Sequence, residues 1–405
     1  MPRNVVFHAP FPTDVTMRFV RAAAKLDDVR LLGVVHTPPQ GEDARLYHDI
    51  VRVTNPLDLR DIIDATDLLQ KRHGPIHRIL GILESMMVQL GQAREHFGVA
   101  GTTATVSELF RDKSRMKAAL AKAGLPVSRN RLVRSVTEAG EFANEVGFPL
   151  VLKPPAGMGG KSTYRVNNAE ELMHTLRGMG VGNGATVLAE EYLRGREFSF
   201  ETITVGGVPR AESISHYLPS CLEAIETPWI KWCCMLPRDI SGSEYDEPRK
   251  MGRAAVAALG LDDGMTHMEW FQRPDGSLVI GEIAQRPAGA NISIMTAFAH
   301  NVDLYRAWNR AVIDSAFDGV WDRQYAVGSA FLRGMGRGRV AAVTGIHEIH
   351  QAIGPLIVEA KIPTLGAPKS DGYEGDGYII IRHPDTEVVK RGLKTIIETV
   401  QVHYA

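Results

Sequence analysis

The chain has 405 residues, of which 47 are acidic and 46 basic, and it contains three cysteines. At roughly 150 residues per domain this length predicts two to three domains. The near balance of charge excludes a global field that would attract nucleic acid or a membrane surface, and the lack of a C-x-x-C pair argues against a disulfide framework or a zinc site. No segment reaches ~18 apolar residues, and no signal-peptide pattern opens the chain, so we expect a cytoplasmic protein.

Short apolar runs alternate with helical patterns over the first hundred residues, beginning "NVVFHAP", "MRFVRAAAKL" and "VRLLGVVHT". Strands that alternate with helices predict a parallel sheet, here a Rossmann-like layer. No G-x-G-x-x-G motif follows the first strand, so the layer carries no obvious dinucleotide site.

A helix is predicted from Lys113 to Ala123, stopped by Gly124. Its apolar residues follow the i, i+3, i+4, i+7 spacing of one helix face: Met116, Ala119, Leu120 and Ala123. Lys113 lies in the first turn, where a cation gains nothing from the helix dipole. A solvated lysine is the alternative to a functional one.

The stretch "VLKPPAGMGGKSTYRV", residues 151–166, imitates a P-loop in its Gly160-Lys161-Ser162 ending. However, Pro155 stands where that motif needs glycine, and strand formers rather than a helix follow. The pattern predicts a hairpin with a glycine-rich tip. Such a tip can hold phosphate with backbone N–H groups and the charge of Lys161, or it can be a surface turn without a ligand.

A second hairpin is predicted in "THMEWFQRPDGSLVIGEIAQRP", because the D-G pair at 275–276 favours a type I′ turn. That turn places Glu269 opposite Glu282, where like charges repel unless a cation lies between them. Carboxylates suit Mg²⁺, and the same face carries His267 and Arg286. The alternative is a solvated or lysine-paired acidic face.

Together these motifs resemble ATP-grasp ligases, with "DKSRMKAALAKAGLPV", "AEEYLRGREFSFE" and "HMEWFQRPDGSLVIGEIAQRP" in the family's order. The resemblance implies an α/β (α+β ATP-grasp) fold. We expect a Rossmann-like N-terminal domain at 1–110, an ATP-grasp domain at 111–321 with its glycine-loop subdomain at about 125–185, and a small β-rich C-terminal subdomain at 322–405.

The resemblance also implies an ATP site. The positions that match nucleotide-binding residues are Lys113, Lys153, Gly157, Gly159, Gly160, Lys161, Glu190, Glu191, Tyr192, Leu193 and Glu197. In the family two lysines contact phosphates, the glycine loop covers them, a hinge strip reads adenine, and a carboxylate takes the ribose. Lys153 is implied to be catalytic as well.

For catalysis, the resemblance makes Glu269 and Glu282 ligands of one or two Mg²⁺ ions, with Mn²⁺ as an alternative, and makes Arg286 the residue that steadies an acyl phosphate. The sequence departs from the family at one position. Ala284 stands where many members have a further metal-binding Asn, and Gln285 is the alternative oxygen donor.

The patterns H-x-E and E-I-A-Q-R-P-A-G resemble the branch that contains L-amino-acid ligases. This branch implies an ATP-dependent carboxylate–amine ligase that forms an amide or peptide bond through an acyl phosphate and releases ADP and phosphate. The alternatives are a purine-pathway ligase using formate or bicarbonate, a kinase-like phosphotransferase, and a nucleotide-binding protein without turnover. We expect small carboxylic acids and amines as partners, no nucleic acid or membrane, and a homodimer as one option.

Substrate residues are expected in the segment least like a general ATP site, "HYLPSCLEAIETPWIKWCCMLPRD". Within this segment the candidate is Trp229, and outside it the candidates are Arg333, His267 and Arg286. For the tryptophans of this segment, core packing is the alternative, and for Arg333 it is a surface arginine.

Overall fold

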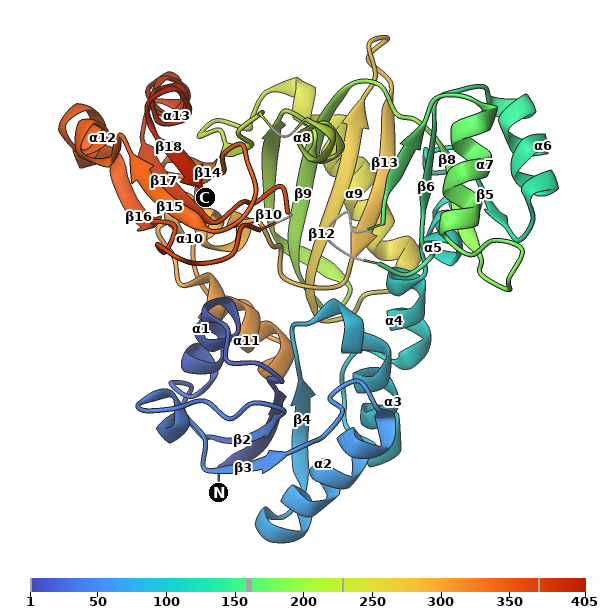
Figure 1. Ribbon diagram of the computed structural model, residues 1–405. Coiled ribbons are helices and arrows are strands. Elements are labelled where there is room, and N and C mark those ends of the chain that lie inside the picture. Colours follow the sequence, from blue (N-terminus) through green and yellow to red (C-terminus); the bar gives the residue numbers. More distant parts are fainter. Residues whose placement is uncertain (1, 158–161, 228, 371) are drawn as a thin grey trace.

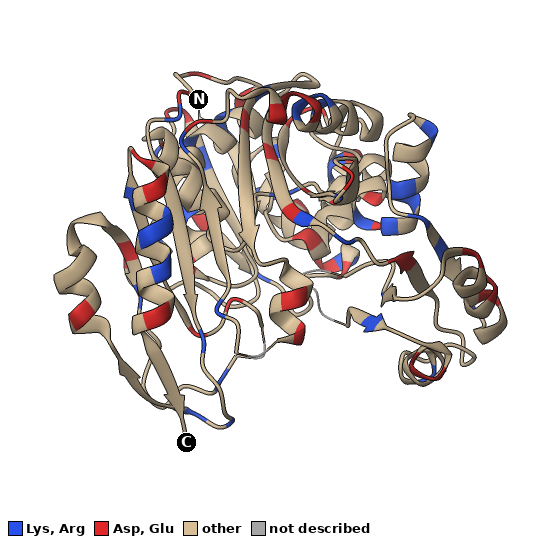
Figure 2. Ribbon diagram, turned by 90° about the horizontal axis from the view of Figure 1, so that it is seen from above, with Lys and Arg blue, Asp and Glu red and all other residues tan. Residues whose placement is uncertain are grey.

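The computed structural model describes residues 2–157, 162–227, 229–370 and 372–405 (Figure 1). The predictions for Gly159, Gly160 and Lys161 therefore lie outside the described residues. Within the described part of the chain, no helix is both long and apolar enough to cross a membrane. Basic and acidic residues are interspersed along the ribbon in the view from above (Figure 2).

The N-terminal part is a parallel sheet in the order β3-β2-β1-β4, which confirms the predicted Rossmann-like layer. Its elements are β1 (Arg3–His8), α1 (Asp14–Ala23), β2 (Val29–Val35), β3 (Asp49–Arg52), α2 (Leu59–His73), β4 (Ile76–Leu80), η2 (Glu84–Met86) and α3 (Met87–Phe97). The strand order reverses between β1 and β4. In open α/β sheets, ligands bind beyond the carboxyl ends of strands at such a switch point. Here the chain leaving β4 runs into η2.

Two helices, α4 (Ala104–Arg111) and α5 (Lys113–Lys122), carry the chain out of this layer. The side chain of Asp112 caps α5 by accepting from the N–H groups of its first turn. Met116 and Leu120 are buried, as the apolar spacing predicts, and the helix ends one residue before the predicted boundary.

A small antiparallel sheet in the order β5-β8-β6-β7 follows, and α6 (Val136–Val146) and α7 (Ala169–Gly178) pack against it (green in Figure 1). Its strands are β5 (Asn130–Val133), β6 (Leu150–Lys153), β7 (Tyr164–Val166) and β8 (Val187–Glu191). The pairing of β6 with β7 confirms the predicted hairpin around the glycine-rich segment.

The largest sheet is antiparallel, in the order β13-β12-β9-β10-β11-β14-β17-β16. Its strands are β9 (Arg196–Val205), β10 (Val208–Leu218), β11 (Cys233–Leu236), β12 (Gly264–Gln272), β13 (Leu278–Ala284), β14 (Ala326–Leu332), β16 (Ile357–Lys361) and β17 (Gly377–His383). The C-terminal segment thus extends this sheet by three strands and adds the separate pair β15 (Val340–Thr344) and β18 (Gln401–Tyr404). The domain boundaries near 110 and 321 stay predictions.

Helices cover this sheet on both faces (Figure 1). They are α8 (Cys221–Glu226), α9 (Asp246–Leu259), α10 (Ile292–His300), α11 (Leu304–Asp314), α12 (Ile346–Ile353) and α13 (Thr386–Thr399). Helix α9 packs on the apolar face of β9 and β12, α13 packs on β14 and β17, and α11 joins the sheet to α1 of the N-terminal layer. The opposite face of β9 and β12 is divided. Ile203 and Met265 pack in the core shared with α11. Glu197, His267 and Glu269, on the same face, line a cavity.

The turn between β12 and β13 differs from the predicted type I′ turn. Gly276 N–H donates to Arg273 O and Arg273 N–H donates to Ser277 O, each at 2.9 Å, and Gly276 has φ +85°. This is a three-residue loop built on a type I turn, and Pro274 takes the position at which such turns favour proline. The predicted two-residue turn was therefore wrong by one residue.

A β-bulge restores the register farther along the same hairpin. Trp270 pairs with Ile280, whereas Glu269 pairs with Glu282, so Gly281 is the extra residue. The predicted opposition of Glu269 and Glu282 is confirmed, although the turn that led to it is not.

Candidate active site

A cavity of about 170 Å³ lies where the small sheet, the large sheet and α8 meet. Most of the described residues predicted for the site line it: Lys113, Lys153, Gly157, Glu190, Glu191, Tyr192, Leu193, Glu197, His267, Glu269, Glu282 and Arg286. The fold therefore brings together side chains that are spread over more than 170 positions of the sequence.

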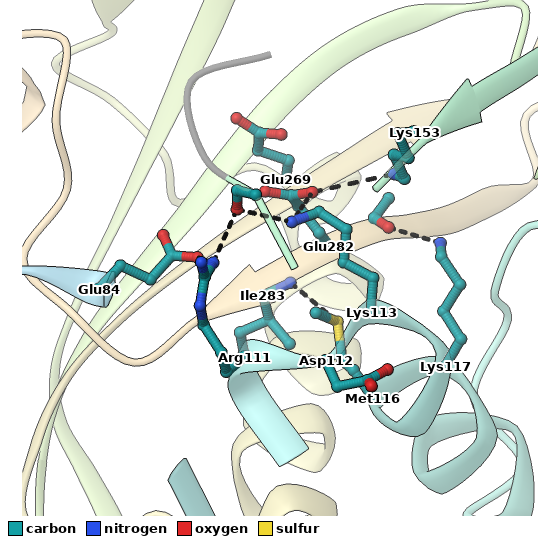
Figure 3. A network of polar contacts seen from close by, with 12 residues as sticks. Glu84, Arg111, Asp112, Lys113, Met116, Lys117, Lys153, Glu269, Glu282 and Ile283 are labelled. Carbon is teal, nitrogen blue, oxygen red and sulfur yellow. Dashed lines mark hydrogen bonds and ion pairs between the residues drawn. The ribbon is translucent and has the colours of Figure 1, made fainter. Parts of the chain in front are cut away.

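Two lysines approach the same carboxylate from different elements (Figure 3). Lys113 Nζ, from the start of α5, lies 3.4 Å from Glu282 Oε2 and donates to Gly157 O at 3.0 Å. Lys153 Nζ, from the end of β6, lies 3.8 Å from Glu282 Oε2 and 3.0 Å from Glu190 Oε2. Lys113 is 6% exposed, so it is not the solvated lysine of the alternative interpretation.

These contacts favour the ionised forms of Lys153 and Glu282. Burial alone would lower the pKa of Lys153, but Glu190 and Glu282 outweigh it and raise the pKa. Burial alone would raise the pKa of Glu282, but Lys113 and Lys153 outweigh it and lower the pKa to about 2. The site therefore holds a fixed carboxylate between two cations.

Lys117 lies behind the cavity lining, in contact with Glu190, and motif reasoning missed it. It is 1% exposed and lies on α5 beside Lys113 (Figure 3). Its Nζ donates to Gly281 O at 2.6 Å and to Ser128 Oγ at 2.8 Å, and lies 3.3 Å from Glu190 Oε1. Gly281 is the bulge residue, so the buried lysine satisfies a bulge carbonyl. The available signal was helical spacing, because Lys117 follows Lys113 by one turn.

The carboxylates on the large sheet form a second cluster. Glu197 Oε2 accepts from Cys221 N–H at 2.8 Å, and burial together with Glu269 raises the pKa of Glu197 well above its usual value. Ligand atoms of Glu197, Cys221 and Glu269 lie within 4.8 Å of one another. Glu269 thus stands between Glu282, its partner across the ladder, and Glu197 on the neighbouring strand β9.

His267 connects this cluster to a buried carboxylate behind it. Its Nδ1 lies 2.9 Å from Glu201 Oε1, and its Nε2 lies 3.5 Å from Glu269 Oε1 and 3.4 Å from Tyr217 Oη. Burial alone would lower the pKa of His267, but Glu201 and Glu269 raise the pKa to about 9. The histidine side chain is therefore held on the predicted face of the sheet.

Arg286 lies just beyond β13 and reaches the N-terminal layer. Its Nε donates to Glu84 Oε2 at 2.9 Å, and its Nη1 donates to Pro287 O at 3.1 Å. Burial acts to lower the pKa of Arg286, but Glu84 outweighs it and raises the pKa. Glu84 was not predicted. Its position beyond the carboxyl end of β4, at the switch point, was the signal that could have identified it.

The strip of residues 190–193 at the end of β8, which the resemblance implies reads adenine, already makes hydrogen bonds within the protein. Glu191 N–H donates to Arg129 O at 2.9 Å and Tyr192 N–H donates to Pro149 O at 3.3 Å. The Glu191 carboxylate accepts from the N–H of Arg129 and from the Arg273 guanidinium. An adenine contact from this strip would have to use other groups.

Several predicted substrate positions do not line the cavity. Trp229 is 70% exposed, and Arg333 Nη1 donates to the carbonyl of Ala224 in α8 at 2.8 Å; neither residue lines the cavity. Trp232 is fully buried and packs against Tyr217 and other aromatic rings, so core packing holds for this residue.

Ala284 stands where many ATP-grasp proteins have a metal-binding Asn, and Gln285 does not replace that Asn in the main cavity. Ala284 is buried opposite His267, and the side chain of Gln285 lines a separate, smaller cavity of about 40 Å³. The Gln285 Oε1 atom is buried without a hydrogen-bond partner there. Among the described residues that line the larger cavity, Gln285 therefore adds no oxygen donor beside Glu269 and Glu282.

Comparison with known proteins agrees with this geometry. Residues 118–297 match the ATP-grasp domain family. The L-arginine-specific L-amino acid ligase of Bacillus subtilis is 27% identical over 239 residues, which make up 58% of this chain and 57% of that protein. The chain thus matches less than two thirds of that relative's length.

Two solved structures share the whole architecture. The L-amino acid ligase from Bacillus licheniformis superposes with a TM-score of 0.81 at 18% identity, covering 100% of this chain and 99% of that one. The N5-carboxyaminoimidazole ribonucleotide synthetase from Thermotoga maritima gives a TM-score of 0.73 at 17% identity, covering 100% of both chains. At these identities the likeness shows the fold. The matches confirm the resemblance to ATP-grasp proteins that the sequence motifs indicated, and the family match itself covers residues 118–297.

Proposed function

We propose that the protein is an ATP-dependent carboxylate–amine ligase that forms an amide or peptide bond through an acyl phosphate. The observation that carries the proposal is the convergence of three kinds of group in one cavity: two lysines suited to phosphate, an opposed carboxylate pair, and a guanidinium. A ligase of this type needs positioning and charge neutralisation rather than a nucleophilic side chain.

The cavity suits a nucleotide. Apolar side chains share its wall with the hinge strip: Val151, Leu222, Ile225 and Phe271. These can cover a purine ring, while Lys113 and Lys153 would contact its phosphates. Both lysines lie against carboxylates in the structure, so we expect ATP phosphates to compete with Glu282 for them.

The carboxylate pair suits magnesium. Glu282 stays ionised at neutral pH, because its pKa is about 2, and it faces Glu269 across the ladder. Bound between them, Mg²⁺ would neutralise charge that develops on the phosphates. Glu197, whose pKa is raised well above its usual value, is better suited to hydrogen bonding with ribose hydroxyls than to holding a metal.

In the proposed reaction the substrate carboxylate attacks the γ-phosphorus of ATP, and the bond to the β–γ bridging oxygen breaks, which releases ADP. The amine then attacks the acyl carbon and phosphate leaves, so the amine loses one proton. Arg286 would hold the carboxylate oxygens with the guanidinium edge that Glu84 and Pro287 leave free.

Amino-acid-like substrates are favoured because two of the similar proteins are described as L-amino acid ligases. The second candidate, a purine-pathway type of ligase using formate or bicarbonate, is supported by the likeness to N5-carboxyaminoimidazole ribonucleotide synthetase. The third, a kinase-like phosphotransferase, would use the same nucleotide site without an amine.

Phosphate release from ATP and Mg²⁺ across a panel of acids and amines tests the proposal. We expect release only when an acid and an amine are both present, and hydroxylamine in place of the amine should give a hydroxamate. Release with formate or bicarbonate favours the purine-pathway type, and a stable phosphorylated product favours the kinase. Nucleotide binding with no release across the whole panel would refute a ligase.

A further inference from the structure

The geometry points to Glu84 as a positioning residue that sets the orientation of Arg286 from the N-terminal domain. This inference rests on the proposed function, because it gives Arg286 its role in acyl transfer. It assigns to the N-terminal layer a part in the chemistry that no sequence motif indicates.

Glu84 is 5% exposed, and each of its oxygens serves a different guanidinium. Oε2 accepts from Arg286 Nε at 2.9 Å, and Oε1 accepts from Arg111 Nη1 at 3.0 Å. Charge-assisted hydrogen bonds of this kind are short and directional, so they fix side-chain orientation. One buried carboxylate therefore orients two cations from two other segments of the chain.

The second arginine extends this contact toward the nucleotide lysines (Figure 3). Arg111 Nη1 and Lys113 Nζ both donate to Gly157 O, each at 3.0 Å. The backbone N–H of Lys113 also donates to Pro155 O at 2.9 Å. Glu84 is thus joined through Arg111 to the carbonyl at which the phosphate-facing lysine is anchored.

Without Glu84, Arg286 has other carboxylates to pair with. Glu269 and Glu282 act on its charge from across the cavity. An arginine released from Glu84 would turn toward these proposed metal ligands and leave the acyl-phosphate position. ATP would still bind, because Glu282 and Gly157 hold Lys113 directly and Glu190 holds Lys153, with or without Glu84. The acyl phosphate would be transferred less efficiently to the amine, and more would be lost to water.

The test compares Glu84→Gln with Glu359→Gln. The control is matched because Glu359 also joins two domains through a bidentate arginine, Arg18, at 2.8 and 3.2 Å, and lies outside the cavity lining. With the acid and amine identified by the panel, Glu84→Gln should slow amide formation about tenfold or more through misplaced geometry. It should also raise the phosphate released per amide formed and leave ATP affinity by calorimetry unchanged. Glu359→Gln should release the same amount of phosphate per amide formed as the parent.

A second measurement does not depend on ligase activity. Phenylglyoxal labelling followed by peptide mass spectrometry should show faster modification of Arg286 and Arg111 in Glu84→Gln than in the parent or the control. Glu84→Asp keeps the charge but has a shorter side chain. It should raise the phosphate-to-amide ratio and the labelling rate of Arg286 by less than Glu84→Gln does, and it replaces Glu84→Gln as the test variant if that variant does not fold.

The outcomes separate the two proposals. If the parent releases no phosphate but Arg286 is labelled faster in Glu84→Gln than in the parent, the positioning contact is supported and the ligase is refuted. An active parent whose Glu84→Gln variant keeps the same ratio of phosphate to amide overturns the positioning role, and so does unchanged labelling of Arg286.

Discussion

Replacing Lys117 with methionine tests the buried charge beneath the site. Lys117 Nζ holds the Gly281 carbonyl at 2.6 Å and the Ser128 hydroxyl at 2.8 Å, and it pairs with Glu190 at 3.3 Å. Methionine fills a similar volume but donates no hydrogen bond. Lys117→Met therefore removes the side-chain donor to a bulge carbonyl. It also removes the cation beside Glu190 Oε1, a buried atom that accepts no hydrogen bond from the described part of the chain.

The size of the effect follows from what is lost and what remains. Removing one partner of a buried ion pair costs about 3–5 kcal/mol, because the other charge stays desolvated. Two features place this case at the lower end. Lys153 still pairs with Glu190 at 3.0 Å, and burial lowers the pKa of Lys117, so charging it is already unfavourable. We expect a loss of about 3 kcal/mol in the free energy of unfolding.

Urea unfolding followed by tryptophan fluorescence measures this loss. Lys122→Met, at an exposed position of the same helix, is the matched control and should change the free energy of unfolding by less than about 0.5 kcal/mol. ATP affinity should also fall in Lys117→Met, because Glu190 then draws on Lys153 alone. A loss below about 1 kcal/mol, within the usual range for surface changes, would refute the assignment of Lys117 as a stabilising buried cation.

Three further predictions concern the cavity and its frame. Lys153→Ala should weaken ATP binding by about 1.5–3 kcal/mol in calorimetry, and an unchanged affinity would remove this lysine from the phosphate site. Glu282→Gln should abolish phosphate release yet tighten the binding of metal-free ATP in EDTA, because the lysines lose their competing carboxylate; an active variant would favour a merely acidic face. Gly195→Ala should lower the free energy of unfolding by roughly 3 kcal/mol or more, because φ is +146° and the new Cβ would overlap the Gln272 carbonyl. The control Gly182→Ala, at φ +95° with free space around the new Cβ, should lower it by only about 1 kcal/mol. The unfolding midpoints of both variants measure the difference.

The sequence correctly predicted that Glu269 faces Glu282, but the turn assumed in that prediction was wrong. The D-G pair suggested a two-residue turn, whereas Pro274 selects a type I turn followed by Gly276 with positive φ. That error shifts the register by one residue, and the bulge at Gly281 shifts it back. A single sequence shows no sign of a bulge beyond a glycine. The predicted pairing of Glu269 with Glu282 is therefore correct only because the longer loop and the bulge cancel.

Helix periodicity predicted the buried residues of α5 only in part. Met116 and Leu120 follow the apolar stripe, and they are buried. Lys113 and Lys117 are also buried, although residue type alone favours exposure for lysine. Their burial depends on carboxylates that enter from strands far away in the sequence, chiefly Glu282. Nothing local to the helix could indicate this.

The ion pairs around the cavity follow one rule that only the folded arrangement shows. Each of three buried or half-buried carboxylates is shared by two cations: Glu84 by Arg111 and Arg286, Glu190 by Lys117 and Lys153, and Glu282 by Lys113 and Lys153. Five cations thus share three carboxylates, so these ion pairs hold more positive than negative groups. Unpaired buried charge is costly, so such a cluster favours a bound anion that brings its own negative charge. ATP phosphates would supply it, and magnesium at the glutamates would offset the remainder of the nucleotide charge. The same excess explains why a single neutral replacement such as Glu282→Gln should strengthen the attraction for metal-free nucleotide while removing a group that the reaction needs.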